Sequence, residues 1–203
     1  MEQHQRLNNL NFMKTLIFIF TTLISSGMIS QELNNKLPYY EIPDYPNEYT
    51  AGTVAARMVD GLGFRYYWAT EGLRDEDLAF RPNDDARTTD ETIDHIYNLS
   101  RTIVNATLKQ PNIRSDNEPE LTFLEKRKKT LENIKTAADI LRKTDDLTEF
   151  KIVFGEREFP FWNNINGPIE DAVWHCGQIV SFRRSSGNPY NSKASLFAGK
   201  VRD

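Results

Sequence analysis

The sequence has very little cysteine and histidine, and it carries no excess of positive charge. Its only cysteine is Cys176, so no disulfide can form within the chain and an exported fold would depend on its core alone. The formal net charge of −4 argues against the basic surface that nucleic-acid binding requires, and we expect no nucleic-acid partner. With 203 residues and an ordinary apolar fraction of 39%, the chain suits one globular domain.

An apolar stretch near the N-terminus has the pattern of a targeting signal. Lys14 precedes a run of about ten apolar residues, and small residues follow before the polar Gln31, an order typical of a secretory signal peptide. The run is too short to cross a bilayer, which takes about 20 apolar residues. We therefore expect residues 1–30 to be a signal peptide, with Met13 as an alternative start. The mature protein should then be periplasmic or secreted, without a stable membrane span.

Beyond this segment the chain changes from extended to helical patterns. Prolines and tyrosines are frequent over residues 31–49, which favours an extended segment lying across the domain. Residues 50–187 contain four stretches with apolar residues at three-to-four spacing, which predict four helices that pack as a bundle. Residues 188–203 are expected to form a C-terminal tail. The four predicted helices run over about 50–73, from Thr88, from near Pro119, and over about 168–187.

Local signals mark the ends of two of these helices. Thr88 and Glu91 have the spacing of a capping box, in which the hydroxyl accepts an early backbone N–H and the carboxylate reaches back. Pro168 at the first helical position and Gly187 beyond the last one delimit the fourth helix. Alternating apolar residues over 150–154 favour a small hairpin or arm between the third and fourth helices. The predicted fold is an all-α four-helix bundle with an N-terminal extended segment and a small hairpin or arm before the last helix.

Two histidines and one aspartate fall on helix faces from which they can meet. Asp171 and His175 are one turn apart, so their side chains project from one face of the fourth helix. His95 stands beside the apolar stripe of the second helix. If these helices are neighbours, the three side chains converge, and two imidazoles with a carboxylate suit zinc, nickel, iron or manganese. Water bound at an open position of such an ion would be a nucleophile near neutral pH.

Each of these residues also has a purely structural interpretation. His95 could be a core-edge histidine satisfied by a carbonyl, and Asp171 could serve the positive end of its helix. Glu91 is explained by the capping box and is only a weak candidate for a catalytic base. His175 is harder to explain as structure, because an interior-facing polar side chain is costly without partners. Cys176 is expected to be a small buried hydrophobe rather than a nucleophile.

The fourth helix resembles the last helix of the DinB-like (YfiT-like) superfamily, which typically reads His-x-x-x-His-Arg-Gly-Gln-Ile. The corresponding residues here are Asp171 and then His175-Cys176-Gly177-Gln178-Ile179, followed by Arg183. Residues 92–99, which include His95, look like the family's second helix. The resemblance covers about residues 50–187. It implies a four-helix bundle that holds a divalent metal in a three-histidine site, and members are regarded as metal-dependent hydrolases or thiol-dependent transferases.

Mapped onto this chain, the resemblance implies His95 and His175 as metal ligands and puts Asp171 where the family has histidine. A carboxylate there favours harder metals, or it marks a metal site that has been lost. Gln178 and Arg183 match the family pattern and are expected to contact the ligands or the substrate. The predicted function is a metal-dependent hydrolase acting on an unidentified small molecule. The alternative is a non-catalytic binding or scaffold protein with a vestigial metal site, and a homodimer remains open for either.

Overall fold

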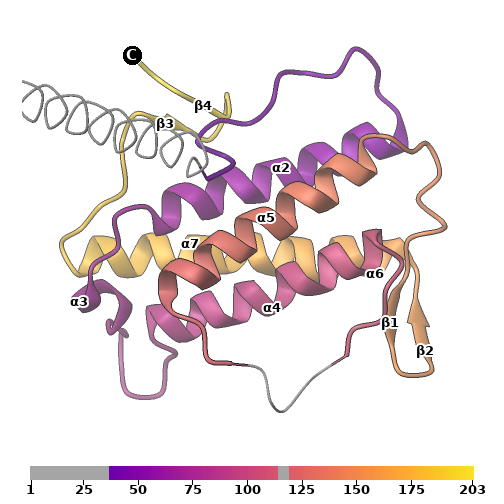
Figure 1. Ribbon diagram of the computed structural model, residues 1–203. Coiled ribbons are helices and arrows are strands. Elements are labelled where there is room, and N and C mark those ends of the chain that lie inside the picture. The colour runs from indigo at the N-terminus through magenta and orange to yellow at the C-terminus, as the bar shows by residue number, and fades with distance from the viewer. Residues whose placement is uncertain (1–36, 114–118) are drawn as a thin grey trace, which may run out of the picture. The chain divides into compact units, whose positions relative to one another are not determined.

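The computed structural model describes residues 37–113 and 119–203, and within these ranges the chain is mostly helical (Figure 1). The predicted signal peptide at 1–30 and the first part of the predicted extended segment lie outside the described residues. Across the described ranges, none of the helices has both the length and the apolar character needed to traverse a lipid bilayer. The long helices are α2 (Ala51–Thr70), α4 (Thr89–Thr107), α5 (Phe123–Leu141) and α7 (Glu170–Ser185).

Shorter elements connect these helices or follow them. Two pairs of short strands form separate antiparallel sheets, β1 with β2 and β3 with β4. The short helices are α3 (Asp75–Leu78), α6 (Phe161–Asn164) and the π-helix η1 (Ile165–Ile169), and the strands are β1 (Ile152–Phe154), β2 (Arg157–Phe159), β3 (Ala194–Ser195) and β4 (Lys200–Val201).

Threonines cap the N-termini of the long helices α2, α4 and α5. At α4 the Glu91 backbone N–H donates to Thr88 Oγ1 over 3.1 Å, and the Thr88 backbone N–H donates to Glu91 Oε2 over 2.7 Å. The capping box predicted for these two residues is therefore confirmed. Thr122 and Glu125 form the same arrangement at the start of α5, and for this reason the helix begins after Thr122 rather than near Pro119.

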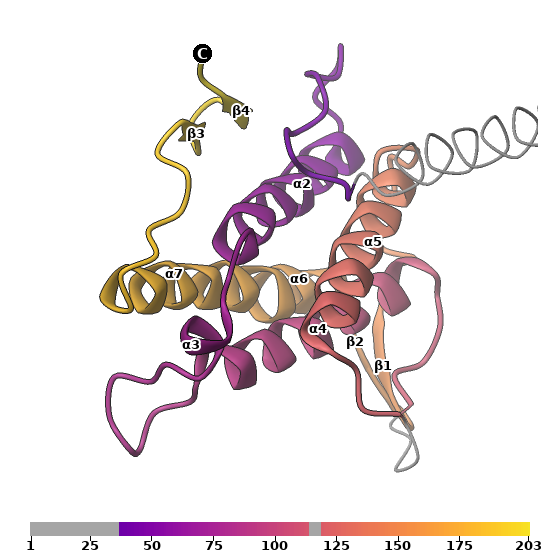
Figure 2. The same cartoon turned by 60° about the vertical axis from the view of Figure 1, so that its left-hand side comes forward.

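The four long helices pack around one core. α2 contacts α5 and α7, and α4 contacts the same two helices, so each long helix has two long neighbours (Figure 2). Each fully buried aliphatic side chain contributes roughly 1.5–3 kcal/mol to folding, so this core fixes α4 beside α7. The largest fully buried side chains are Val59, Leu62, Phe64 and Tyr66 on α2, Ile93, Ile96 and Ile103 on α4, Leu131, Ile134 and Leu141 on α5, Ile169 in η1 and Ile179 on α7.

Residues 37–49 and the C-terminal tail pack against α2. The buried Tyr39 donates its hydroxyl hydrogen to Asp60 Oδ1 over 3.1 Å. Its ring lies so close to Gly63 that a Cβ at that position would come within 2.4 Å of it, so only glycine fits there. The Ile42 backbone N–H donates to the Gly199 carbonyl over 2.8 Å. The tail itself forms the strand pair of β3 and β4, which its sequence did not predict, and this hydrogen bond joins it to residues 37–49.

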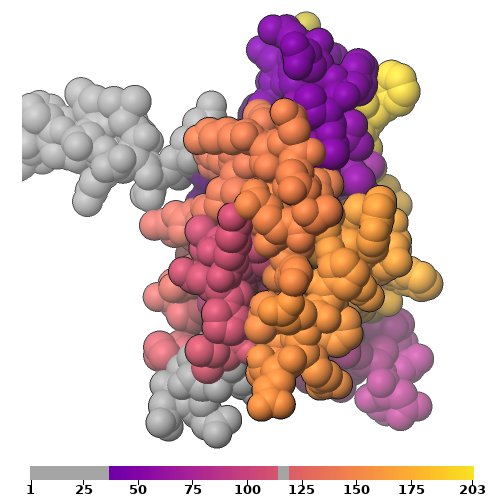
Figure 3. Space-filling view, turned by 90° about the vertical axis from the view of Figure 1, so that its right-hand side faces the viewer, coloured from indigo at the N-terminus to yellow at the C-terminus, as the bar shows by residue number. Residues whose placement is uncertain are grey.

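β1 and β2 form an antiparallel hairpin in the stretch where alternation favoured a hairpin or arm. Ile152 pairs with Phe159 and Phe154 pairs with Arg157. Figure 3 shows the molecule from the side on which this hairpin lies. The hairpin leads directly into the helical segment that carries two residues of the candidate site.

The last helical segment begins earlier than the sequence predicted. α6, η1 and α7 follow one another without a break from Phe161 to Ser185, and Pro168 lies inside η1. The predicted helix start at Pro168 is therefore wrong. Proline lacks an N–H and clashes with the carbonyl of the preceding turn in an α-helix, and a wider π-helical turn accommodates it. η1 thus sets the orientation in which α7 presents Asp171 and His175.

Candidate metal centre

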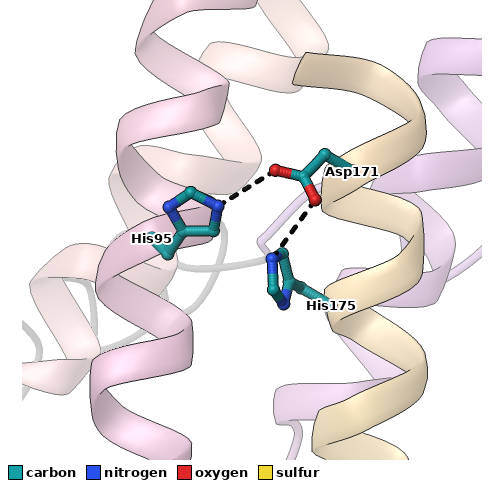
Figure 4. Close-up of side chains that lie close together, drawn as sticks. All are labelled: His95, Asp171 and His175. Carbon is teal, nitrogen blue, oxygen red and sulfur yellow. Dashed lines mark hydrogen bonds and ion pairs between the residues drawn. The ribbon is translucent and has the colours of Figure 1, made fainter. Parts of the chain in front are cut away.

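His95, Asp171 and His175 lie together where α4 and α7 pack against each other (Figure 4). His95 is in the second turn of α4, immediately before the fully buried Ile96. Asp171 and His175 are in the first two turns of α7 at i and i+4, so both side chains leave the same side of the helix. The structure therefore brings together the three residues that the sequence proposed as one site.

The Asp171 carboxylate lies between the two imidazole rings. Its Oδ2 is 3.0 Å from His95 Nε2, and its Oδ1 is 3.3 Å from His175 Nε2. The ring centroids are 4.6 Å apart, with the planes at 89°. One ligand atom from each residue lies within 4.8 Å of the other two. Two ligands at about 2.0–2.2 Å from a shared ion lie roughly 3–4 Å apart. The separations in this cluster, at most 4.8 Å, are close to that range.

Gln178 holds the ring of His175 in one orientation. His175 Nδ1 is 2.7 Å from Gln178 Oε1, and because an amide oxygen only accepts, this contact is a hydrogen bond in the tautomer that carries the ring N–H on Nδ1. In that tautomer of the neutral ring, the lone pair is on Nε2, the atom that faces Asp171. A lone pair and a carboxylate repel each other unless a cation or a proton lies between them. The donor set therefore fits a divalent cation, and Gln178 occupies the outer position typical of metal-bound histidines.

The cluster is open to solvent on one side. The side chain of His175 is 14% exposed, that of His95 is 32% exposed and that of Asp171 is 42% exposed. A structural zinc site is usually closed by four protein ligands, whereas three ligands beside solvent leave room for water and a small molecule. In residues 37–113 and 119–203, this is the one place where three or more histidine, cysteine, aspartate or glutamate side chains come together in this way.

No protein-family model, curated protein or solved structure matches this chain. What the site can do is therefore indicated by its own side chains.

Glu91, the weak candidate for a catalytic base, acts as a helix cap. Its carboxylate accepts the Thr88 backbone N–H and is exposed to solvent. This hydrogen bond lowers the pKa of Glu91 below its ordinary value. A lower pKa makes a carboxylate a weaker base, so its role as a helix cap accounts for Glu91.

Arg183 does not belong to the cluster, and in the described structure its partners are backbone carbonyls and Asn188 rather than the three candidate ligands. Its side chain is buried, and its Nη1 donates to the carbonyls of Trp68 and Ala69 over 3.1 and 3.0 Å. Its Nε donates to the carbonyl of Asn188 over 2.7 Å. Arg183 therefore satisfies carbonyls at the C-terminal end of α2 and fixes the turn after α7, where its charge suits the helix ends.

Cys176 is buried, with 2% of its surface exposed, as expected for a small hydrophobe. Burial raises the pKa of its thiol to about 12, so the thiolate form that nucleophilic attack requires is scarce. Cysteine-based catalysis is thus a poor fit to this helix, although Cys176 directly follows His175.

Asn164 is a polar residue that the sequence did not single out. It ends α6 just before η1, is fully buried, and neither amide atom has a hydrogen-bond partner among the described residues. A buried amide without partners is costly, and a bound water is the usual remedy. In the sequence, Asn164 stands beside Asn163 among the apolar residues Phe161, Trp162 and Ile165, and this pattern does not show which of the two asparagines is buried.

Proposed function

We propose that this chain is a divalent-metal-dependent enzyme, a hydrolase acting on a small molecule, built on a four-helix bundle of the DinB-like type. The convergence of His95, Asp171 and His175 is the observation that carries the proposal. The mutual contacts of α2, α4, α5 and α7 support the bundle. The order of residues near Lys14 supports export, so the enzyme would work outside the cytoplasm.

The three clustered side chains would hold zinc, nickel, iron or manganese. A bound divalent ion lowers the pKa of water and so supplies a nucleophile near neutral pH. Gln178 keeps Nε2 of His175 directed at the shared point, because it accepts the opposite N–H. His95 and His175 come from two helices of one core, so the ligands are held by rigid elements rather than by a loop. Asp171 adds a hard oxygen donor that favours iron or manganese more than a third imidazole would.

A non-catalytic binding or scaffold protein is the second candidate, and one observation favours it. Asp171 lies within hydrogen-bonding reach of His95 and close to His175, so the three side chains can partly satisfy one another as an ion pair network. In that case both imidazoles would carry a proton on Nε2 and the carboxylate would accept from each. The cluster would then stabilise the contact between α4 and α7 without any reaction.

Hydrolysis assays on the full chain separate the two candidates. The substrates are a panel of nitrophenyl esters, phosphate esters and amides, offered to metal-loaded protein, to chelated protein, and to the variants His95→Ala and His175→Ala. Glu170→Gln is the matched control, since Glu170 is exposed beside Asp171 and is not part of the cluster.

The proposal expects turnover of at least one substrate class, lost on chelation and in both histidine variants and kept in Glu170→Gln. Metal binding without turnover of any substrate favours the binding protein. Turnover that survives both chelation and the histidine variants contradicts the proposed site.

A further inference from the structure

A cavity of about 310 Å³ lies where α7 faces α2 and the C-terminal tail. Val173, Gly177 and Val180 line it from α7, and their three-to-four spacing places them on one side of the helix. His175 leaves α7 from a different side, toward α4. The cavity is therefore separate from the candidate metal centre. Its volume falls at the lower end of the range for small-molecule sites, about 300–1,000 Å³.

Most of the cavity wall is apolar. Trp68 of α2, which is buried, forms part of it, and Tyr190 and Leu196 of the tail contribute further apolar surface. The tail reaches this position because it runs back from the end of α7 toward α2 (Figure 2). The uncharged thiol of Cys176 completes the wall. Such a surface suits the hydrocarbon part of a ligand.

Two arginines, Arg65 and Arg184, also line the cavity. Arg65 Nη1 donates to the Gly61 carbonyl of its own helix over 2.9 Å, and the Arg184 guanidinium lies 5.5 Å from the centre of the Tyr190 ring. Within the described ranges neither arginine has an ion pair, and no acidic residue lines the cavity. Each guanidinium therefore keeps N–H donors free for an anion.

Two other arginines that contact α2 do pair with carboxylates. Arg127 pairs with Glu71, and Arg142 pairs with Asp60 over 2.5 Å. The sequence also has more acidic than basic residues, 29 against 25, so carboxylates are not scarce. Because no carboxylate lines this cavity, Arg65 and Arg184 give it a positive charge.

Gly177 lines the cavity without a side chain of its own. It lies in the interior of α7, where glycine weakens a helix, and a Cβ added there would have no atom within 4 Å. Close packing therefore does not require glycine at this position. Because Gly177 lines the cavity, a large side chain at this position would extend over it.

We propose that this cavity binds a small organic carboxylate, an alkyl or aryl acid whose apolar body packs against the Trp68 side and whose carboxylate reaches Arg65 and Arg184. Guanidinium groups match the planar carboxylate through paired N–H donors. Inorganic phosphate could bind the two arginines but would leave the apolar wall uncovered. An acid with a hydrocarbon body contacts both parts of the cavity and is therefore the better fit. Binding here is independent of the metal centre.

Isothermal titration of the full chain with phenylacetate, and with the neutral phenylacetamide of nearly the same shape, tests the proposal. We expect saturable binding of phenylacetate at one site, and binding of the amide at least tenfold weaker. Arg65→Gln and Arg184→Gln should each weaken phenylacetate binding about tenfold, the effect of one charge-assisted contact. Arg157→Gln, an exposed arginine on β2, is the matched control and should change nothing.

Two further variants separate this cavity from the metal centre and from general loss of structure. Gly177→Leu should abolish binding while the circular dichroism spectrum stays unchanged, and His175→Ala should leave binding intact. The proposal is overturned if the amide binds as tightly as the acid, if neither arginine variant weakens binding, or if phosphate competes with phenylacetate at equal concentration. Absence of any saturable binding overturns it as well.

Discussion

Asp171 Oδ2 lies 3.0 Å from His95 Nε2, although 76 positions separate the two residues in the sequence. The contact joins α7 to α4, and the other oxygen of the same carboxylate faces His175. A carboxylate that faces two ring nitrogens is stable when a cation lies between the three groups, or when both ring nitrogens carry a proton. In the proposed metal centre, the identity of residue 171 would therefore influence which metal is preferred.

Replacing Asp171 should change metal preference in a direction set by the new side chain. Asp171→His creates three imidazole donors, and we expect a tighter site for zinc and nickel and a weaker one for manganese. Asp171→Asn removes the charge and should weaken binding of every ion. Competition titrations with a chromophoric chelator measure these affinities, with Glu170→Gln as the control for lost charge at the same helix end. Equal manganese and zinc affinities in wild type and Asp171→His would count against Asp171 as a ligand.

Gln178→Ala should weaken metal binding without unfolding the protein. Its amide oxygen accepts from His175 Nδ1 at 2.7 Å, and loss of such an outer contact typically costs about 10–100-fold in metal affinity. Isothermal titration with zinc gives the affinity, and thermal unfolding reports the fold. Gln110→Ala, at an exposed position outside the cluster, should behave as wild type. If both glutamine variants bind zinc equally well, Gln178 does not orient His175.

Arg183→Ala should destabilise the fold and leave metal affinity unchanged. The variant removes the donors to the carbonyls of Trp68 and Ala69, and we expect the free energy of unfolding to fall by about 2–3 kcal/mol. Urea denaturation measures this loss, and Arg157→Ala serves as the exposed control. A stable Arg183→Ala variant that no longer binds metal would restore the role that the sequence suggested.

Asp77 should make stability fall in acid. Its side chain is buried and accepts hydrogen bonds from Arg74, from Ser186 Oγ at 2.6 Å and from Asn188 Nδ2 at 2.6 Å. The Arg74 guanidinium, more than the other partners, holds the pKa of Asp77 far below its ordinary value of about 3.9. Because the folded-state pKa is lowered, the stabilisation is complete above the unfolded-state pKa. It is lost as the pH falls below about 4 toward the folded-state pKa.

The Asp77→Asn variant isolates this contribution. It should lose about 2 kcal/mol of unfolding free energy at neutral pH and show a smaller further loss in acid than wild type. Urea denaturation at several pH values measures both effects. Asp75→Asn, an exposed neighbour in α3, is the control. An unchanged acid dependence in Asp77→Asn would show that other groups dominate.

Features with a local cause were predictable from the sequence. The Thr88–Glu91 capping box depends on residues within one turn, so the start of α4 was predicted correctly. The common face of Asp171 and His175 follows from helix geometry alone. Their meeting with His95 needed one further assumption, that the second and fourth long helices are neighbours, and α4 does pack against α7.

Features that depend on distant partners were not predictable. Arg183 at the end of a helix could have faced solvent or a ligand, and only the position of α2 shows that it serves the carbonyls of Trp68 and Ala69. Pro168 looked like a helix start, because the sequence does not show that a π-helical turn can absorb it. The position of the strand pair in the tail involves a backbone hydrogen bond between Ile42 and Gly199, which are far apart in the chain.

The most direct test of the metal centre is the metal content of purified protein by elemental analysis. Wild type, His95→Ala, His175→Ala and the control Glu170→Gln are each offered zinc, nickel, iron and manganese in turn and then freed of loosely bound ions. We predict close to one ion per chain for wild type and the control with at least one of the metals, and loss of that ion in both histidine variants. Wild-type protein that retains none of the four metals, or histidine variants that retain as much as wild type, would contradict a centre formed by His95, Asp171 and His175.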